Sequence, residues 1–207
     1  MKFILGTKVN MTQIFDDQGR VIPGTVISAG PMTVTQVKNM NKDKYESVQV
    51  GFGERQAKNV SKAVKGHLKN MALPAGKTFQ YLKEFRLTNP ELKVGDVIDV
   101  SVFNEGDNIT VRGLTKGKGF QGVVKRHGFH GGPRSHGQKH SEREPGSIGA
   151  TAPQRVFKGV RMGGRMGGDL ISVKNLKIVK INKVNNQLFV SGAIPGRRGT
   201  LIEIIAK

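Results

Sequence analysis

The 207-residue sequence contains no cysteine and no tryptophan. Without cysteine the chain forms no disulfide and no thiolate zinc site, and the simplest compartment to expect is the cytosol. No apolar run approaches the ~18 residues that a membrane-spanning helix needs. The N-terminal MKFILGTK has a short apolar patch but lacks the core of a signal peptide. These absences argue against a secreted or membrane-inserted protein.

Acidic residues are also scarce, because 34 Lys and Arg face only 15 Asp and Glu and the formal net charge is +19. Such a charge destabilises a compact fold by self-repulsion unless a polyanion screens it. Nucleic acid is the commonest such partner. An anionic membrane is the alternative, but it requires an amphipathic helix with bulky apolar residues opposite the cations, and we find none. Lysine added only for solubility is the remaining explanation. We expect a nucleic-acid partner and no membrane.

The charge is concentrated in residues 113–168, which hold 15 of the 28 glycines and four of the five histidines. Eleven Lys or Arg and two acids give this stretch a formal charge of +9. Its apolar residues show no sustained period of 2 or 3.6, so no face can bury a core. A segment of this composition stays disordered or takes its order from a partner. We interpret it as an extended Gly/Arg/Lys-rich loop that penetrates RNA.

Three residue types in this loop suit RNA contacts. Arginine bridges phosphates and stacks on bases, and lysine acts as a point charge. Neutral imidazoles hydrogen-bond or stack on exposed bases and riboses. The predicted RNA-binding residues are Lys116, Lys118, Lys125, Arg126, His127, His130, Arg134, His136, Lys139, His140, Arg143, Arg155, Lys158, Arg161 and Arg165. Glycines let the backbone approach RNA closely, and this role is predicted for Gly117, Gly119, Gly122, Gly163, Gly164, Gly167 and Gly168.

The rest of the chain, 1–112 and 169–207, is predicted to be one β domain whose strands hold both ends of the loop. Short alternating runs separated by turn signals indicate a small barrel or sandwich. The predicted strands are 11–15, 20–22, 25–29, 33–38, 47–52, 79–87, 96–103, 108–114, 170–174, 176–184, 187–193 and 200–205. We expect Pro23 to interrupt the pattern, the turn 104–107 to pair the strand 96–103 with 108–114, and Asn185-Asn186 to form a tight hairpin turn. A short basic helix is predicted in an excursion at 53–92, where apolar residues from Ala57 to Leu68 are spaced for one helix face.

Two patterns in the loop resemble enzyme or metal sites. Gly117-Lys118-Gly119-Phe120-Gln121-Gly122 fits G-x-G-x-x-G, but a dinucleotide site needs a following helix, and the glycine-rich sequence after Arg126 predicts none. The H-R-D and D-F-G strings of a kinase are absent. His136 and His140 have the i, i+4 spacing of a zinc pair, but Gly137 intervenes and no glutamate follows His136. We therefore predict no enzyme, no metal and no cofactor.

These motifs carry a family resemblance. Gly113-x-Thr115-x-Gly117-Lys118-Gly119-x-x-Gly122-x-x-x-Arg126 resembles the signature of the bacterial form of the large-subunit ribosomal protein L-three family. The resemblance continues through Pro145–Gly149, Val156–Gly159, Arg165–Gly167 and, at the N-terminus, Met11–Phe15. It implies a six-stranded translation-protein-type β-barrel, in a mostly β (α+β) fold, and a loop that threads into large-subunit rRNA towards the peptidyl transferase centre. It further implies a cytoplasmic, ribosome-bound protein that acts early in subunit assembly beside the L-fourteen and L-nineteen families. It implies no small-molecule substrate.

Three hypotheses follow. The first is a structural rRNA-binding constituent of the large subunit. The second is a free nucleic-acid chaperone that never enters a stable particle. The third is a nucleotide-dependent enzyme that uses the G-x-G-x-x-G loop.

Overall fold

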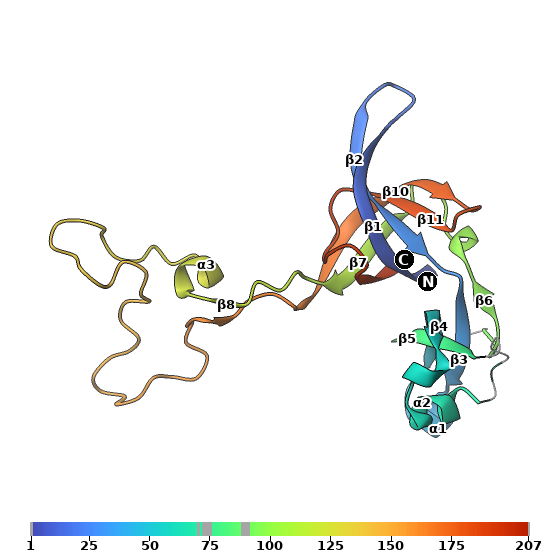
Figure 1. Cartoon of the computed structure of the whole chain (residues 1–207), viewed down its shortest axis with the longest axis horizontal. Helices are drawn as coiled ribbons and strands as arrows, with labels where there is room; N and C mark the ends of the chain where they lie inside the picture. Colours follow the sequence, from blue (N-terminus) through green and yellow to red (C-terminus); the bar gives the residue numbers. More distant parts are fainter. Residues whose placement is uncertain (1, 70, 72–75, 88–91, 207) are drawn as a thin grey trace. The chain divides into compact units, whose positions relative to one another are not determined.

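The structure, a computed structural model, describes residues 2–69, 71, 76–87 and 92–206. Six strands form a closed barrel in the order β1-β12-β7-β10-β11-β2, and each neighbouring pair is antiparallel (Figure 1). The barrel strands are β1 (Lys2–Phe15), β2 (Val21–Ala29), β7 (Asn108–Leu114), β10 (Leu170–Asn182), β11 (Gln187–Ser191) and β12 (Leu201–Ala206). The predicted mostly β fold with a six-stranded barrel is confirmed.

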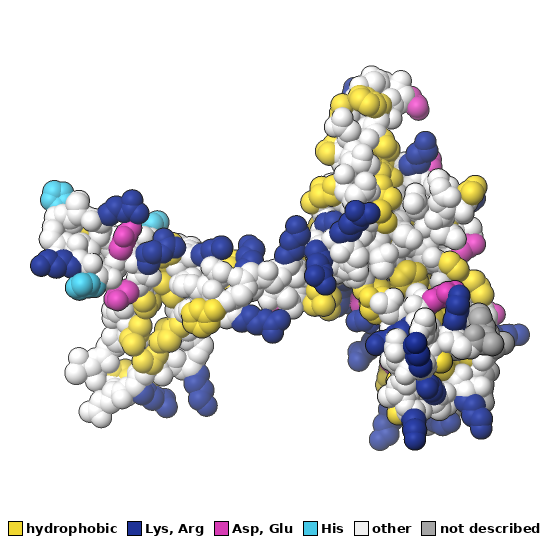
Figure 2. Space-filling model, in the orientation of Figure 1, with side chains coloured by type: hydrophobic (Ala, Val, Ile, Leu, Met, Phe, Trp, Pro, Cys, Tyr) yellow, Lys and Arg dark blue, Asp and Glu magenta, His cyan; other side chains and the backbone are white. Residues whose placement is uncertain are grey.

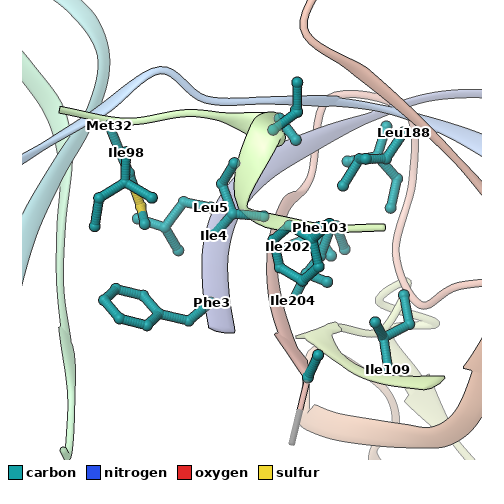
Figure 3. Close-up of a cluster of buried hydrophobic side chains, with 14 of the residues drawn as sticks. Phe3, Ile4, Leu5, Met32, Ile98, Phe103, Ile109, Leu188, Ile202 and Ile204 are labelled. Carbon is teal, nitrogen blue, oxygen red and sulfur yellow. The ribbon is translucent and has the colours of Figure 1, made fainter. Parts of the chain in front are cut away.

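The barrel strands alternate between inward apolar and outward polar residues. In β12, Ile202, Ile204 and Ala206 are buried, and the residues between them are partly exposed. Ile204 lies opposite Ile4 of β1 and Val111 of β7. Side chains from all six strands meet in one hydrophobic core, part of which is drawn in Figure 3. Period-2 patterning therefore directs one face of every strand into the barrel.

A second sheet has the strand order β5-β4-β3-β6. Its strands are β3 (Met32–Lys38), β4 (Ser47–Gln56), β5 (Lys77–Phe85) and β6 (Val97–Ile98). Its buried residues belong to the same hydrophobic cluster as the barrel residues. The ring of Phe3 on β1 lies 4.4 Å from the ring of Phe85 on β5, which explains why Phe3, Ile4 and Leu5 are buried at three consecutive positions.

Short helices accompany this sheet. They are α1 (Met40–Asp43), the 3₁₀ turn η1 (Ala57–Asn59) and α2 (Lys62–His67). The Ser61 hydroxyl caps α2 by accepting the Val64 N–H at 3.4 Å. The predicted excursion thus contains a helix, shorter than the apolar spacing suggested. Residues 70, 72–75 and 88–91 of the predicted excursion lie outside the described residues.

The predicted strand 96–103 is wrong. Only Val97–Ile98 is a strand, and it pairs with Met32–Thr33 of β3 instead of with 108–114. Val100–Val102 forms a 3₁₀ turn (η2), because the Asp99 carboxylate accepts the Ser101 N–H at 2.8 Å and turns the backbone. The strand 108–114 is confirmed as β7, but its partners are β10 and β12. The alternation of apolar and polar residues identifies a strand, but it does not show which other strand pairs with it, because that depends on residues far away in the sequence.

Three further details differ from the predictions. The first strand begins at Lys2 and not at Met11. Pro23 does not interrupt β2; it lies opposite Gln13 of β1, and its carbonyl oxygen accepts the Gly192 N–H at 2.9 Å. The two predicted strands after residue 169 are one strand, β10, with a bulge at Asn175, where φ is 59°. The positive φ predicted for the asparagine turn is confirmed at Asn186, where φ is 50°.

Candidate nucleic-acid interface

Residues Thr115–Asp169 form a compact unit of their own, separate from the residues up to Leu114 and from Leu170 onward. This unit, described without gaps, contains β8 (Phe120–Gln121), α3 (Val123–His127) and β9 (Gly164–Arg165). Val123 is its one buried residue. The space-filling view shows Lys and Arg side chains distributed along the segment with the histidines among them (Figure 2). As the sequence indicated, the segment has no hydrophobic core.

The two ends of the segment are held together by a hydrogen-bonded stem. Phe120 pairs with Arg165 and Gln121 with Gly164 in the β8–β9 ladder. Backbone bonds of 2.9 Å join Thr115 to Asp169, Lys118 to Met166 and Met166 to Gly119. We call residues 115–121 and 164–169 the stem, and residues 122–163 the distal loop.

Five of the seven glycines predicted to approach RNA have a positive φ or a close neighbour within the protein itself. Gly119, Gly167 and Gly168 have φ between 68° and 76°, and added Cβ atoms at Gly163 and Gly164 would press on Gln121 and Arg126. The clearest case is Gly167. Its φ is 76°, and a Cβ there would overlap the carbonyl oxygen of Lys116. The positive φ favours glycine at positions 119, 167 and 168 whether or not RNA is present, whereas small shifts of the neighbouring atoms could admit a Cβ at Gly163 and Gly164.

Gly117 and Gly122 are different. Neither has a positive φ, and an added Cβ at either position would meet no atom within 4 Å. Gly122 is the N-cap of α3, a position that favours glycine. The protein's own packing gives no reason for glycine at position 117, where close approach of RNA to the backbone stays a prediction.

Paired alanine substitutions test this distinction. Gly167→Ala is expected to break the stem in the free protein, because it adds both backbone strain and overlap. Gly117→Ala is expected to leave the free protein unchanged and to lower rRNA affinity about tenfold, the effect of one disturbed contact. Hydrogen exchange of the Lys118 and Met166 amides reports the stem, and filter binding reports the affinity. Unchanged rRNA binding by Gly117→Ala would show that RNA does not approach the backbone at that position.

A helix follows the G-x-G-x-x-G string, contrary to the prediction from sequence. α3 covers Val123–His127 and ends at Gly128, whose φ of 73° is left-handed. The apolar Val123, folded inward and only 3% exposed, anchors this single turn. Five residues are too few for the helix N-terminus of a dinucleotide site, which continues into a long helix packed on a sheet.

Arg126 and His127 point toward the opposite leg of the loop. The Arg126 Nη1 donates to the Met162 carbonyl oxygen at 2.8 Å, and the His127 Nε2 lies 3.1 Å from the same oxygen. Both side chains are only partly exposed. They cross-link the loop at the end of the stem, a structural role that the sequence did not indicate, and their role as RNA ligands stays a prediction.

The loop is cross-linked again near its tip. The Gly132 N–H donates to the Glu142 carbonyl at 3.0 Å, and the Arg134 Nε donates to the Glu142 carboxylate at 2.9 Å. A Cβ at Gly131 would overlap the Glu142 carbonyl oxygen. One of the two acidic residues of the segment therefore orders the loop, a role that counting charges alone did not reveal.

The remaining predicted residues face solvent. Thirteen of the fifteen are exposed: Lys116, Lys118, Lys125, His130, Arg134, His136, Lys139, His140, Arg143, Arg155, Lys158, Arg161 and Arg165. No group of three or more potential metal ligands occurs among the described residues. The hollow of about 660 Å³ lined by His127, His130, Glu144 and Arg161 carries charged and imidazole groups on an open surface.

Sequence reasoning missed two aromatic residues. Phe120 is 79% exposed and Phe157 is 55% exposed, and the Arg155 guanidinium lies 5.6 Å from the centre of the Phe157 ring. Exposed rings are platforms on which bases stack. The sequence could have predicted their exposure, because both phenylalanines lie in a segment that has no hydrophobic core in which to bury them.

A second basic surface also went unnoticed. Lys174, Lys177 and Lys180 on β10 are exposed. Because their spacing of three does not fit strand alternation, only the bulges in β10 bring them all to the exposed side.

Comparison with known proteins agrees with this geometry. The family described as "Ribosomal protein L3" matches residues 38–194. A protein of Herpetosiphon aurantiacus named "Large ribosomal subunit protein uL3" is 48% identical over 203 residues, which cover 97% of this chain and 94% of that protein. A protein of the same name from Chlorobaculum tepidum is 47% identical over 207 residues, covering 100% of this chain and 99% of that protein.

Proposed function

The chain belongs to the ribosomal protein L3 family, and from this membership we propose that residues 113–168 are its principal contact with large-subunit rRNA. It is a structural, non-enzymatic constituent of the large ribosomal subunit. Among the residues that the structure describes, no helix has the length and apolar character needed to cross a membrane.

One observation carries the proposal. The unit Thr115–Asp169 contains eleven Lys and Arg against three acids, and Val123 is its single buried residue. Most of its positive charge is therefore exposed and has no acidic partner within the unit. Each phosphate neutralised by such a charge releases condensed counterions, which provides most of the affinity.

The strands of the barrel hold the two ends of the loop together. Because β7 and β10 pair through Leu114 and Leu170, the barrel strands hold both ends of the segment side by side. The stem continues this pairing to Gln121 and Gly164. A loop held at both ends loses less entropy when RNA orders it than a free basic tail would. The barrel thus serves as the anchor of the RNA-binding segment.

The resemblance in sequence supports a finer proposal. The distal loop reaches towards the peptidyl transferase centre, where it organises rRNA without taking part in the chemistry. The chain joins the particle early in assembly and contacts neighbours of the L-fourteen and L-nineteen families.

Removing four loop charges tests the principal proposal. Lys116, Lys118, Lys125 and Lys158 are exposed, and their joint replacement by Gln is expected to lower the log–log salt slope of rRNA binding by about 3 to 4. Arg126 is left in place because it bonds to Met162. The measurement is rRNA affinity by filter binding at several salt concentrations.

A matched control removes the same net charge elsewhere. Lys42, Lys58, Lys62 and Lys65 are also exposed but lie near α1 and α2, and their replacement by Gln is expected to change the slope much less. Equal slopes for the two variants would mean that overall charge, and not the loop, determines binding. Loss of the protein from large subunits in a high-salt wash would instead favour the free chaperone.

A further inference from the structure

The β1–β2 hairpin extends beyond the barrel as a two-stranded ribbon (Figure 1). β12 stops pairing with β1 at Thr7, and β11 stops pairing with β2 at Gly24. Two further backbone bonds follow, from the Lys8 N–H to Thr200 at 3.1 Å and from the Gly192 N–H to Pro23 at 2.9 Å. Beyond them, and after a bulge between Lys8 and Asn10, Asn10–Phe15 of β1 pair only with β2, and Val21 and Ile22 of β2 pair only with β1. Isolated two-stranded ribbons are marginally stable in water.

One face of this ribbon is apolar and exposed. Met11, Gln13 and Phe15 alternate along β1, and Val21 lies directly opposite Phe15 on β2. Met11 is 52% exposed, Phe15 66% and Val21 50%. The space-filling view shows apolar side chains along the hairpin (Figure 2). A row of large apolar side chains on an otherwise unsupported ribbon is typical of a surface that binds a partner.

The charge of the ribbon differs from that of the rest of the chain. Residues 9–19 contain no Lys or Arg, and the tip carries Asp16 and Asp17 beside one cation, Arg20. Asp16 also orders the turn, since its carboxylate accepts the N–H groups of Gln18 and Arg20 at 3.0 and 2.8 Å. The ribbon therefore presents an apolar, slightly acidic surface in a chain of net charge +19.

From this combination we propose that the hairpin face formed by Met11, Phe15 and Val21 docks against another protein of the large subunit. The partner presents an apolar groove with Lys or Arg at the end that receives Asp16 and Asp17. RNA is disfavoured because the tip carries two carboxylates, which repel phosphate, against a single cation, Arg20. A second copy of the chain is disfavoured by repulsion between two strongly basic molecules.

Site-specific photocrosslinking in assembled large subunits tests the proposal. The full chain carries p-benzoylphenylalanine in place of Phe15, and the control carries it in place of Val184, which is 92% exposed. We expect the Phe15 probe to give one main adduct that resists ribonuclease, is removed by protease and contains a single second ribosomal protein. The Val184 probe is expected to give no adduct with that protein. An adduct digested by ribonuclease, a dimer of this chain, or no adduct at the Phe15 position would overturn the proposal.

A substitution that keeps the loop intact gives a second test. Phe15→Ser combined with Val21→Thr is expected to lower retention of the crosslinked protein about tenfold or more after a high-salt wash, as removal of an interface hot spot does. Quantitative mass spectrometry of the washed subunits measures that retention. Affinity of the free variant for rRNA is expected to stay unchanged. Full retention of the partner protein would contradict the proposal that this face is a docking site. The rRNA affinity of loop variants tests a different proposal, the function of residues 113–168.

Discussion

A chain in which Asn-Gly replaces residues 122–163 is expected to bind large-subunit rRNA about a thousandfold more weakly than the intact chain. Gln121 and Gly164 lie directly opposite each other, so a two-residue turn can join them without disturbing the stem. The exchange removes eight of the segment's eleven Lys and Arg residues. Specific binding exceeds non-specific binding by about a thousandfold or more, and the shortened chain is expected to retain only the non-specific part.

The same exchange is expected to leave the barrel folded, because the strands that hold the loop stay paired. Thermal unfolding of the two chains provides the control, and filter binding at fixed salt measures the affinity. A shortened chain with unchanged unfolding and unchanged rRNA affinity would show that the main contact lies on the barrel, for example at Lys174, Lys177 and Lys180.

The second large effect concerns the core that anchors the loop. Ile204→Ala is expected to lower the free energy of unfolding by about 3 kcal/mol, within the range found for buried Ile→Ala changes. Ile204 is fully buried and lies between Ile4 and Val111 on the neighbouring strands. Its removal leaves a cavity that the closed barrel cannot collapse to fill.

Urea unfolding measures this loss, with a lower midpoint at an unchanged slope. Val184→Ala serves as the control, because Val184 is 92% exposed and its truncation is expected to cost less than about 0.5 kcal/mol. The predicted role of the core is contradicted if both substitutions have the same small effect.

Much of the architecture could be predicted from the sequence because strand alternation is a local signal. The period-2 patterns of β7 and β12 identify strands whatever their partners. The strand predicted at 96–103 failed because Asp99 redirects the backbone after only two paired residues. The beginning of β1 was missed because Phe3, Ile4 and Leu5 are buried together, and a strand covered on both faces does not alternate.

The sequence predicted which segment forms the candidate site, but it did not predict the role of each residue within that segment. Composition located the segment, since glycine and cations without apolar periodicity exclude a core. The inward bonds of Arg126 and His127 to Met162, and of Arg134 to Glu142, join residues that the sequence does not show to be neighbours. The glycines also fall into two groups that the sequence does not distinguish. A Cβ at Gly167 would overlap the Lys116 carbonyl oxygen, whereas a Cβ at Gly117 would meet no atom within 4 Å.

The sequence by itself determined that this chain has a β domain able to fold and a basic segment unable to bury a core, because burial and charge depend on composition and short-range pattern. The tertiary structure decided which strands pair, which side chains cross-link the loop and which remain available to RNA, because these depend on contacts between residues far apart in the chain. It also decided that the hairpin formed by β1 and β2 leaves the barrel with an apolar face uncovered, because only the tertiary structure shows that backbone bonds to the neighbouring segments end at Lys8 and Pro23.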